Sequence, residues 1–314
     1  MQPDTTTAST LARPALGARS KPNERRKPGL PGRIWWFIAP ALVFYAFVTL
    51  IPSIRGISDA FTDWDGISIT RNFVGLKNFI KIFSDRAALA AIGQTLTIAV
   101  AVTVIQNLVG LLLALGIASR IRSRKILSVI LFAPAVVTPL VTAYVWKFMY
   151  TPGGPLFSIF DMFGIGDLTP SWLGDHRLAL WSVIAVIIWQ FAGYSMVIFL
   201  AGLQAIPKDI VEAAELDGAG SFASTLFIKL PLLGPAFLVN IMLSLTSGLK
   251  QFDLVWVMTA GGPGTSTHTI STLIYQNAFQ FGYYGFSIAL AVMLTLIAIP
   301  VSLVQFRIAT RSNS

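Results

Sequence analysis

The chain has 314 residues, of which 54% are hydrophobic and only 12% are charged, and its formal net charge is +9. Soluble globular domains carry about 25% charged residues, so this composition excludes a soluble domain of this size and places the chain in a lipid bilayer. Cysteine is absent, which excludes disulfides and thiolate metal sites.

Residues 1–32 precede the first apolar run and are rich in Pro, Ala, Thr and Arg. Such a segment buries too little apolar surface to fold alone, so we predict a disordered basic tail. Its Arg25, Arg26 and Lys27 are suited to contact anionic lipid. The charged part is long and no small-residue cleavage site follows the apolar run, so the first span is expected to be an uncleaved anchor.

Six apolar runs follow, each close to the 20 or so residues that a helix needs to cross the hydrocarbon core. Because the runs are continuous rather than alternating, and because unpaired backbone groups are too costly in lipid, we predict an all-α membrane protein. The transmembrane domain is expected at residues 33–310. The predicted spans are residues 34–54, 95–118, 126–149, 178–202, 234–252 and 285–304.

Lysine and arginine are concentrated on one side of these spans. They cluster in the tail, between the second and third spans, in the loop 206–231, and after the last span. Positively charged loops stay in the cytoplasm, so both termini and the loop 206–231 are expected to face it. The net positive charge therefore indicates how the chain is oriented in the membrane. Scattered cations without interleaved aromatic residues do not make a nucleic-acid surface, and we expect no nucleic-acid partner.

The loop 206–231 has the pattern of two short helices separated by Gly218. Asp209, Glu212 and Glu215 recur at three-residue steps and share one face of the first helix. Gly218 allows backbone angles that strain other residues, and Pro231 is expected to end the second helix. The pattern predicts a small, partly charged projection suited to a cleft in another protein.

The sequence offers no constellation for catalysis or metal binding. The two histidines, His176 and His268, fall in predicted external loops and are expected to be solvated rather than metal-bound. No glycine-rich phosphate loop is followed by Lys and Ser or Thr, so the chain is not expected to hydrolyse ATP. We therefore expect no catalytic residue, no metal ligand and no cofactor in this chain.

The loop carries a resemblance to a known family. Its spacing of Glu-Ala-Ala, three residues, Gly, nine residues and Ile-x-Leu-Pro resembles the cytoplasmic loop of permease subunits of binding-protein-dependent ABC importers. The resemblance implies a type I ABC importer permease fold, in which this loop meets a separate ATPase subunit that binds ATP and Mg²⁺. The implied coupling residues are Glu212, Ala213, Ala214, Asp217, Gly218, Ile228, Leu230 and Pro231.

Looser motifs at residues 73–79, 205–207 and 259–263 are similar to the carbohydrate-uptake branch of that family. Within it, the chain is similar to the first permease subunit of maltose-type and glycerol-phosphate-type transporters, without the extra N-terminal spans and large periplasmic domain of the former. The resemblance implies import of a sugar, an oligosaccharide or a sugar-like polyol phosphate through the bacterial cytoplasmic membrane. It also implies three kinds of partner: a second permease subunit, an ATPase dimer and an extracytoplasmic substrate-binding protein.

Polar and aromatic side chains inside the fourth and fifth spans are the candidates for the substrate path. At membrane depth such groups either line a path or join helices, and both roles stay open. The resemblance to the maltose-type subunit places four of them at or beside its sugar contacts, although Gly248 stands where that subunit has Asn. The candidates are Trp189, Gln190, Tyr194, Ser244, Ser247 and Gln251.

Other functions fit these spans less well. An ion-coupled secondary transporter usually has carboxylates within the membrane, and the central parts of these spans contain no Asp or Glu. A membrane-embedded enzyme needs a cluster of His, Asp or Cys at the interface, which the sequence does not offer. An ABC importer for a solute other than a sugar stays open.

Overall fold

The computed structural model describes residues 33–119 and 123–311. The chain divides into two units, Met1–Pro52 and Ser53–Ser314. Within the described residues the regular structure is helical, and the sole extended pairing is an isolated bridge between Thr62 and Phe73. This confirms the predicted all-α class. The predicted tail, residues 1–32, lies outside the described residues.

The first predicted span begins in the first unit. It comprises α1 (Arg33–Tyr45) and the π-helical turn η1 (Ala46–Leu50), followed by α2 (Ile51–Asp59). The 24 residues Trp36–Asp59 are long and apolar enough to cross a membrane. Large side chains such as Trp36 and Phe37 are not buried within this unit, and so much apolar surface needs a covering of lipid or packed side chains.

Long helices form the frame of the second unit. The second predicted span is one 33-residue helix built from α4 (Arg86–Ala101), η2 (Val102–Gln106) and α5 (Asn107–Ala118). It begins earlier than expected because the Asp85 side chain accepts the first backbone N–H groups and caps it. The fourth and sixth predicted spans are also single helices, α9 (Ala179–Ala205) and α16 (Tyr284–Arg311).

The third predicted span, residues 126–149, is not a single helix. It consists of α6 (Arg124–Val136) and α7 (Pro139–Met149), which meet at an angle of 96°. Pro139 forces the preceding residue out of the helical region, and Thr138 is extended with ψ 141°. Gln190 of α9 donates a hydrogen bond of 2.8 Å to the Val137 carbonyl at the break. The side chain thus replaces a backbone bond that the bend removes.

The fifth predicted span, residues 234–252, is bent at its start. The helical run of α11 (Ser221–Ser224), η4 (Thr225–Lys229) and α12 (Leu230–Leu232) turns by 66° into α13 (Gly234–Leu249). Pro231 does not end the run as expected. It sits in the first turn of α12, where its missing N–H is tolerated, and the break falls at Leu233. With each bent pair counted as one span, the described residues hold the six predicted spans.

The central helix of the second unit is α9, which packs against α5, α6 and α13. Glycines set the closest approaches. A Cβ on Gly193 would overlap the Leu131 carbonyl oxygen of α6, and a Cβ on Gly248 of α13 would lie 2.7 Å from the Ala99 Cα of α4. Small residues at such contacts let membrane helices touch backbone to backbone.

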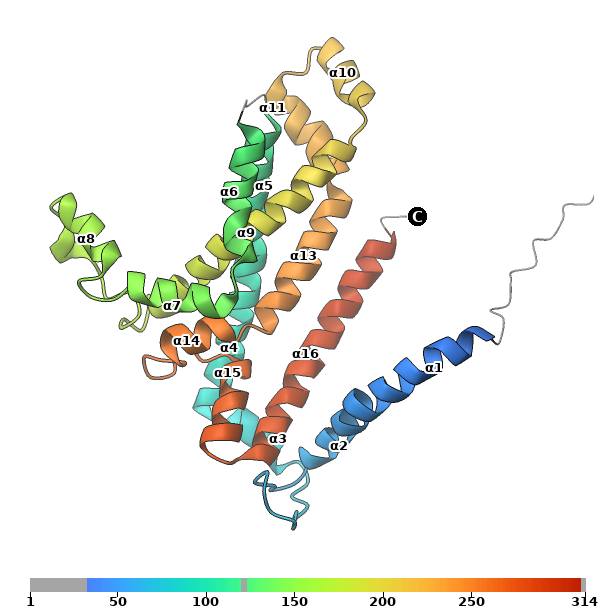
Figure 1. Cartoon of the computed structure of the whole chain (residues 1–314), viewed down its shortest axis with the longest axis vertical. Helices are drawn as coiled ribbons and strands as arrows, with labels where there is room; N and C mark the ends of the chain where they lie inside the picture. The colour runs from blue at the N-terminus through green and yellow to red at the C-terminus, as the bar shows by residue number, and fades with distance from the viewer. Residues whose placement is uncertain (1–32, 120–122, 312–314) are drawn as a thin grey trace, which may run out of the picture. The chain divides into compact units, whose positions relative to one another are not determined.

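Several short helices complete the second unit: α3 and α15 lie toward the end opposite the loop 206–231, α14 lies nearer the middle, and α8 lies to the side beyond α7 (Figure 1). The short helices are α3 (Lys77–Ser84), α8 (Pro155–Met162), the 3₁₀ turn η3 (Gly166–Leu168), α14 (Asp253–Thr259) and α15 (Ile270–Tyr275), which η5 (Gln276–Gln280) continues. The first N–H of α15, on Ile270, donates to the buried Thr95 hydroxyl of α4 at 2.9 Å. One side chain thus joins the short helices to a long one.

Replacing Thr95 with Val should lower the free energy of unfolding by about 1–3 kcal/mol, because the shape is kept while the buried Ile270 N–H loses its acceptor. Thr97→Val is the matched control, since the Thr97 hydroxyl bonds only to a carbonyl of its own helix. The measurement is thermal unfolding of both purified variants in one detergent. Equal unfolding temperatures would contradict the role of Thr95.

Candidate functional site

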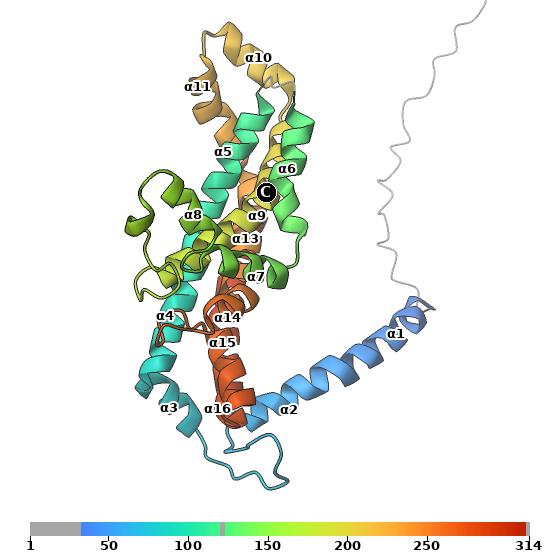
Figure 2. The ribbon, with the colours of Figure 1, turned by 60° about the vertical axis from the view of Figure 1, so that its left-hand side comes forward.

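The loop 206–231 forms a projection at one end of the second unit. It consists of α10 (Lys208–Leu216), followed by the turn at Gly218 and then by α11, η4 and α12. α10 and α11 lie beyond the ends of α5 and α6, both in Figure 1 and after the 60° turn of Figure 2. The predicted pair of short helices separated by Gly218 is therefore present.

The end of α10 explains why the sequence has glycine at 218. Gly218 has a φ of +87°, which strains any residue with a Cβ. Its N–H donates to the Glu215 carbonyl at 3.1 Å, and the N–H of Ala219 donates to the Ala214 carbonyl at 2.9 Å. These two bonds define a Schellman cap, which ends a helix sharply and turns the chain away.

The coupling residues predicted from the sequence divide into a tip and a base. Glu212, Ala213, Asp217 and Gly218 are exposed, whereas Ala214 is buried. Ile228 and Leu230 are half-buried, and Leu230 packs against the core cluster around Met196 and Phe199. Pro231 is exposed. The charged tip is thus free to meet another protein, while the apolar base anchors it to α5 and α9.

The six candidate substrate-binding residues differ in their exposure. Trp189 and Tyr194 on α9 are 47% and 45% exposed, and Ser247 on α13 is exposed as well. Gln190, Ser244 and Gln251 are buried. The structure therefore brings aromatic and hydroxyl groups to the surface of two adjacent helices, and places the other three candidates inside the helix bundle.

Buried polar groups form a layer between three helices. Asn107 of α5 donates to the Ser244 hydroxyl at 3.0 Å, and Ser244 donates to the Asn240 carbonyl of its own helix at 2.7 Å. Gln106 donates to the Ser195 hydroxyl of α9 at 2.8 Å. In this conformation the Ser244 hydroxyl hydrogen-bonds only to other groups of the described chain. This agrees with the alternative that Ser244 joins two helices.

Three residues of this region were not singled out from the sequence. Gln106 and Asn107 are adjacent amides in an otherwise apolar span, a signal that marks functional or helix-joining positions. Trp146 of α7 lies edge-on to Trp189, with ring centroids 5.2 Å apart. No periodicity links Trp146 to Trp189, because the 96° bend before α7 brings them together.

The histidines differ in their surroundings. His176 is exposed, as expected, but His268 is buried, so the expectation that it is solvated is wrong. Its loop between α14 and α15 folds back, and the Nδ1 atom lies 3.3 Å from the Thr272 hydroxyl. Burial lowers the pKa of His268 because it disfavours the charged imidazolium. Within the described residues, no three of His, Cys, Asp and Glu gather as metal ligands.

Comparison with known proteins agrees with this architecture. Residues 106–313 match the family model described as binding-protein-dependent transport system inner membrane component. The probable starch degradation products transport system permease protein AmyD of Thermoanaerobacterium thermosulfurigenes is 37% identical over 86% of this chain and 91% of its own. The multiple sugar-binding transport system permease protein MsmF of Streptococcus mutans is 31% identical over 88% and 95%.

A solved structure shows the same fold. A chain of a bacterial ABC transporter involved in the import of the acidic polysaccharide alginate superposes with a TM-score of 0.77, at 22% identity over 89% of this chain and 96% of that one. The chain therefore belongs to the family of inner membrane components of binding-protein-dependent transport systems. It is a multi-pass inner membrane permease with the fold of type I ABC importers.

Proposed function

We propose that this chain is the permease subunit that carries a carbohydrate through an ABC importer, the substrate being a sugar, an oligosaccharide or a sugar-like polyol phosphate. The observation that carries the proposal is the exposed acidic tip of the loop 206–231 on a chain whose relatives AmyD and MsmF are named for starch products and multiple sugars. The tip supplies a contact for the ATPase subunit, and the names of the relatives indicate a carbohydrate substrate.

The proposed partners are a second permease subunit, an ATPase dimer that holds ATP and Mg²⁺, and an extracytoplasmic binding protein that delivers the substrate. Both termini and the loop 206–231 face the cytoplasm in this proposal. Closure of the ATPase dimer on ATP would draw two such loops together and rock the helices from inward-facing to outward-facing. This is a rigid-body change biased by a ligand that binds elsewhere. The chain itself supplies no catalytic group.

Each part of the loop has a defined task in this mechanism. Glu212 offers charge to a basic residue in the ATPase cleft. Ala213 at the surface permits close approach, and the buried Ala214 keeps α10 near its base. Gly218 makes the turn that separates the two short helices. Because Leu230 packs on the core, motion of the tip is transmitted to α5 and α9.

The proposed substrate path runs along α9 and α13. Trp189 and Tyr194 are exposed aromatic side chains against which the apolar face of a sugar ring can stack, and Ser247 offers an exposed hydroxyl on α13. Gln251 ends the path near the short helices. Gln190 and Ser244, which bond to Val137 and Asn107 here, reach a sugar only if those bonds exchange during transport.

Replacing Gln251 with Ala should change the relative uptake of different sugars by about 5- to 150-fold, because one lost hydrogen bond in a dehydrated path is worth about 1–3 kcal/mol. Ser244→Ala separates the two roles of that residue. Loss of the Asn107 bond lowers the unfolding temperature, whereas loss of a sugar contact changes preference. The measurement pairs uptake of several sugars with thermal unfolding of the complex. Unchanged preference in both variants would remove both residues from the path.

The substrate class itself is tested with the complete importer in proteoliposomes. We expect ATP hydrolysis to rise when the binding protein is loaded from a panel of mono- and oligosaccharides and polyol phosphates, and not from amino acids. A response to amino acids or another non-carbohydrate solute would overturn the carbohydrate assignment and leave the importer assignment intact. Uptake driven by an ion gradient, without the ATPase subunit, would overturn both.

A further inference from the structure

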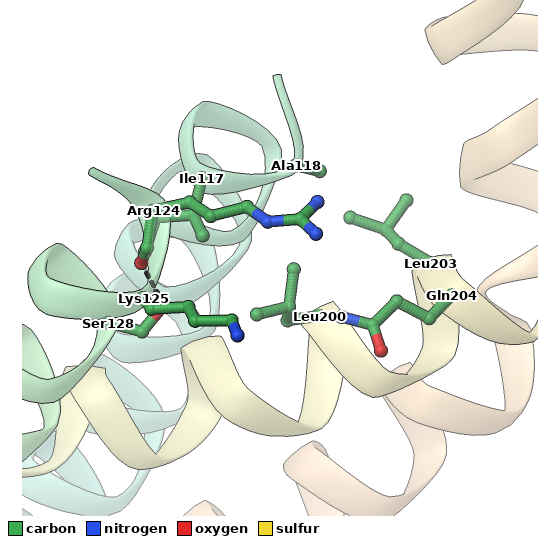
Figure 3. Close-up of a pocket in the computed structure, with 8 residues that line it drawn as sticks. All are labelled: Ile117, Ala118, Arg124, Lys125, Ser128, Leu200, Leu203 and Gln204. Carbon is green, nitrogen blue, oxygen red and sulfur yellow. Dashed lines mark hydrogen bonds between the residues drawn. The ribbon is translucent and has the colours of Figure 1, made fainter. Parts of the chain in front are cut away.

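A basic cavity lies between the ends of α5, α6 and α9, beside the loop 206–231. It has a volume of about 330 Å³, which falls in the range of cavities that take small organic ligands. Arg124 and Lys125 enter it from the start of α6, and Gln204 enters from the last turn of α9 (Figure 3). Three nitrogen-bearing groups from two helices therefore converge on one space.

The two cations have no counter-charge of their own. Among the described residues, neither Arg124 nor Lys125 has a carboxylate within ion-pair distance. The Ser128 hydroxyl, which also lines the cavity, is used by its own helix and donates to the Arg124 carbonyl at 2.7 Å. Two carboxylates at this end, Glu212 and Glu215, line a neighbouring hollow and are not among the residues that line the cavity. An anion entering the cavity thus meets two free cationic groups and an amide.

The rest of the cavity lining is apolar and alternates with the polar groups, since Ile117 lies beside Arg124 and Leu200 lies between Lys125 and Gln204 (Figure 3). It is formed by Ile117 and Ala118 at the end of α5 and by Leu200 and Leu203 on α9. A fully hydrated inorganic ion makes no use of apolar side chains in its site. A molecule that carries a phosphate next to hydrocarbon contacts both kinds of side chain, and a phospholipid has this chemistry where its headgroup meets the glycerol.

The cavity also stands beside a surface that only lipid or a partner can cover. Ile126, Val129 and Ile130 on α6 are exposed directly after the two cations. Farther along, α6 and α9 touch at Leu131 and Gly193, so the cavity occupies the turns where the same two helices leave room. The positive-inside rule accounts for basic residues at this end of α6, but it does not account for their convergence with Gln204 on a half-apolar cavity.

From this geometry we infer that the cavity binds the phosphate group of an anionic phospholipid. Arg124 and Lys125 neutralise the phosphodiester, Gln204 donates a hydrogen bond to it, and Leu200 and Leu203 cover the adjoining glycerol and first methylenes. Ala118 and Leu203 also line the neighbouring hollow that contains Glu212. The bound lipid therefore holds α6 on α9 immediately behind the coupling tip. The inference rests on the membrane location of the chain and not on its substrate.

The test measures which lipid stays with the complete importer. Complexes are reconstituted in nanodiscs of phosphatidylcholine with a minority of phosphatidylglycerol, and the lipid retained after extraction and gel filtration is quantified by mass spectrometry. Wild type should enrich phosphatidylglycerol over the bulk ratio about tenfold or more, since each basic group contributes about a factor of five. The double variant Arg124→Gln with Lys125→Gln should fall close to the bulk ratio.

Two further variants keep the test specific. Lys77→Gln with Arg177→Gln removes two exposed cations outside the cavity and should retain the enrichment. Ala118→Phe places a large side chain in the cavity while both cations remain, and this variant should lose the enrichment. Equal loss in both double variants, or full enrichment with the cavity filled, would overturn the assignment. Arg120 and Arg122 remain in all variants, so the charge bias that orients the chain is kept.

Two other occupants are distinguished in the same experiment. If replacing chloride by inorganic phosphate at equal ionic strength abolishes the enrichment, and phosphate is retained with the protein, then the source is soluble phosphate and the lipid assignment is wrong. If the cavity variants shed the ATPase subunit while the lipid ratio stays at the wild-type value, the cations serve that subunit instead, and the lipid assignment is equally overturned.

Discussion

Replacing Glu212 with Lys is expected to abolish uptake while the protein still reaches the membrane. Glu212 is exposed at the tip of the loop 206–231 and lies outside the three core clusters, so the change leaves the helix packing intact. In the proposed contact, Lys faces a basic residue of the ATPase in a partly desolvated cleft. Two like charges at such an interface cost several kcal/mol of association.

The measurement is co-purification of the ATPase subunit together with uptake. Glu212→Gln is the control, because it keeps the size of the side chain and removes only the charge. We expect it to retain part of the ATPase and part of the transport. Wild-type yield of ATPase and normal uptake in the Lys variant would show that Glu212 has no part in docking, and would leave the membrane fold of the chain untouched.

Replacing Gly193 with Ala is expected to destabilise the second unit. The effect should be larger than that of a Gly→Ala substitution at any other glycine of α4, α5 or α9. The added Cβ overlaps the Leu131 carbonyl oxygen and lies 2.9 Å from the Phe132 Cα. Both are backbone atoms, so no side chain can move aside and α6 itself must shift away from α9. Overpacking of this kind costs about 1–3 kcal/mol, and sometimes more.

Gly93→Ala is the matched control. Gly93 also lies within a long helix, α4, but a Cβ there meets nothing within 4 Å. Alanine favours a helix over glycine by roughly 0.5–1 kcal/mol, so this variant should be neutral or slightly more stable. Thermal unfolding of both variants in the same detergent decides the matter. Similar unfolding temperatures would mean that α6 and α9 do not touch at Gly193.

The membrane class and most of the spans follow from local sequence alone. An apolar run of about 20 residues cannot remain in water and must hydrogen-bond its own backbone in lipid. This reasoning predicted spans at residues 95–118, 178–202 and 285–304, and the structure has single helices there, the first of which starts nine residues earlier at Arg86. The coupling loop is equally local. Gly218 with its positive φ ends α10 through bonds that reach back no farther than five residues.

Hydropathy alone did not reveal the shape of the third span. Residues 126–149 form one apolar run, and Pro134 and Pro139 both lie within it. The structure keeps Pro134 inside α6 and breaks the chain before Pro139. The Val137 carbonyl freed by the break is accepted at low cost because Gln190 of α9 donates to it. That partner is 53 residues away, so the two prolines mark where the helix can bend, but the local sequence does not say which of them breaks it.

The sequence by itself thus determined that this is an all-α membrane protein with a glycine-hinged loop, because both depend on residues within a turn or two of one another. Only the tertiary structure decided what its polar side chains do. Gln106 meets Ser195 across 89 residues, and Asn107 meets Ser244 across 137. Arg124, Lys125 and Gln204 converge on one cavity for the same reason. A buried polar group takes whichever partner helix packing brings within reach, and helix packing is a property of the whole chain.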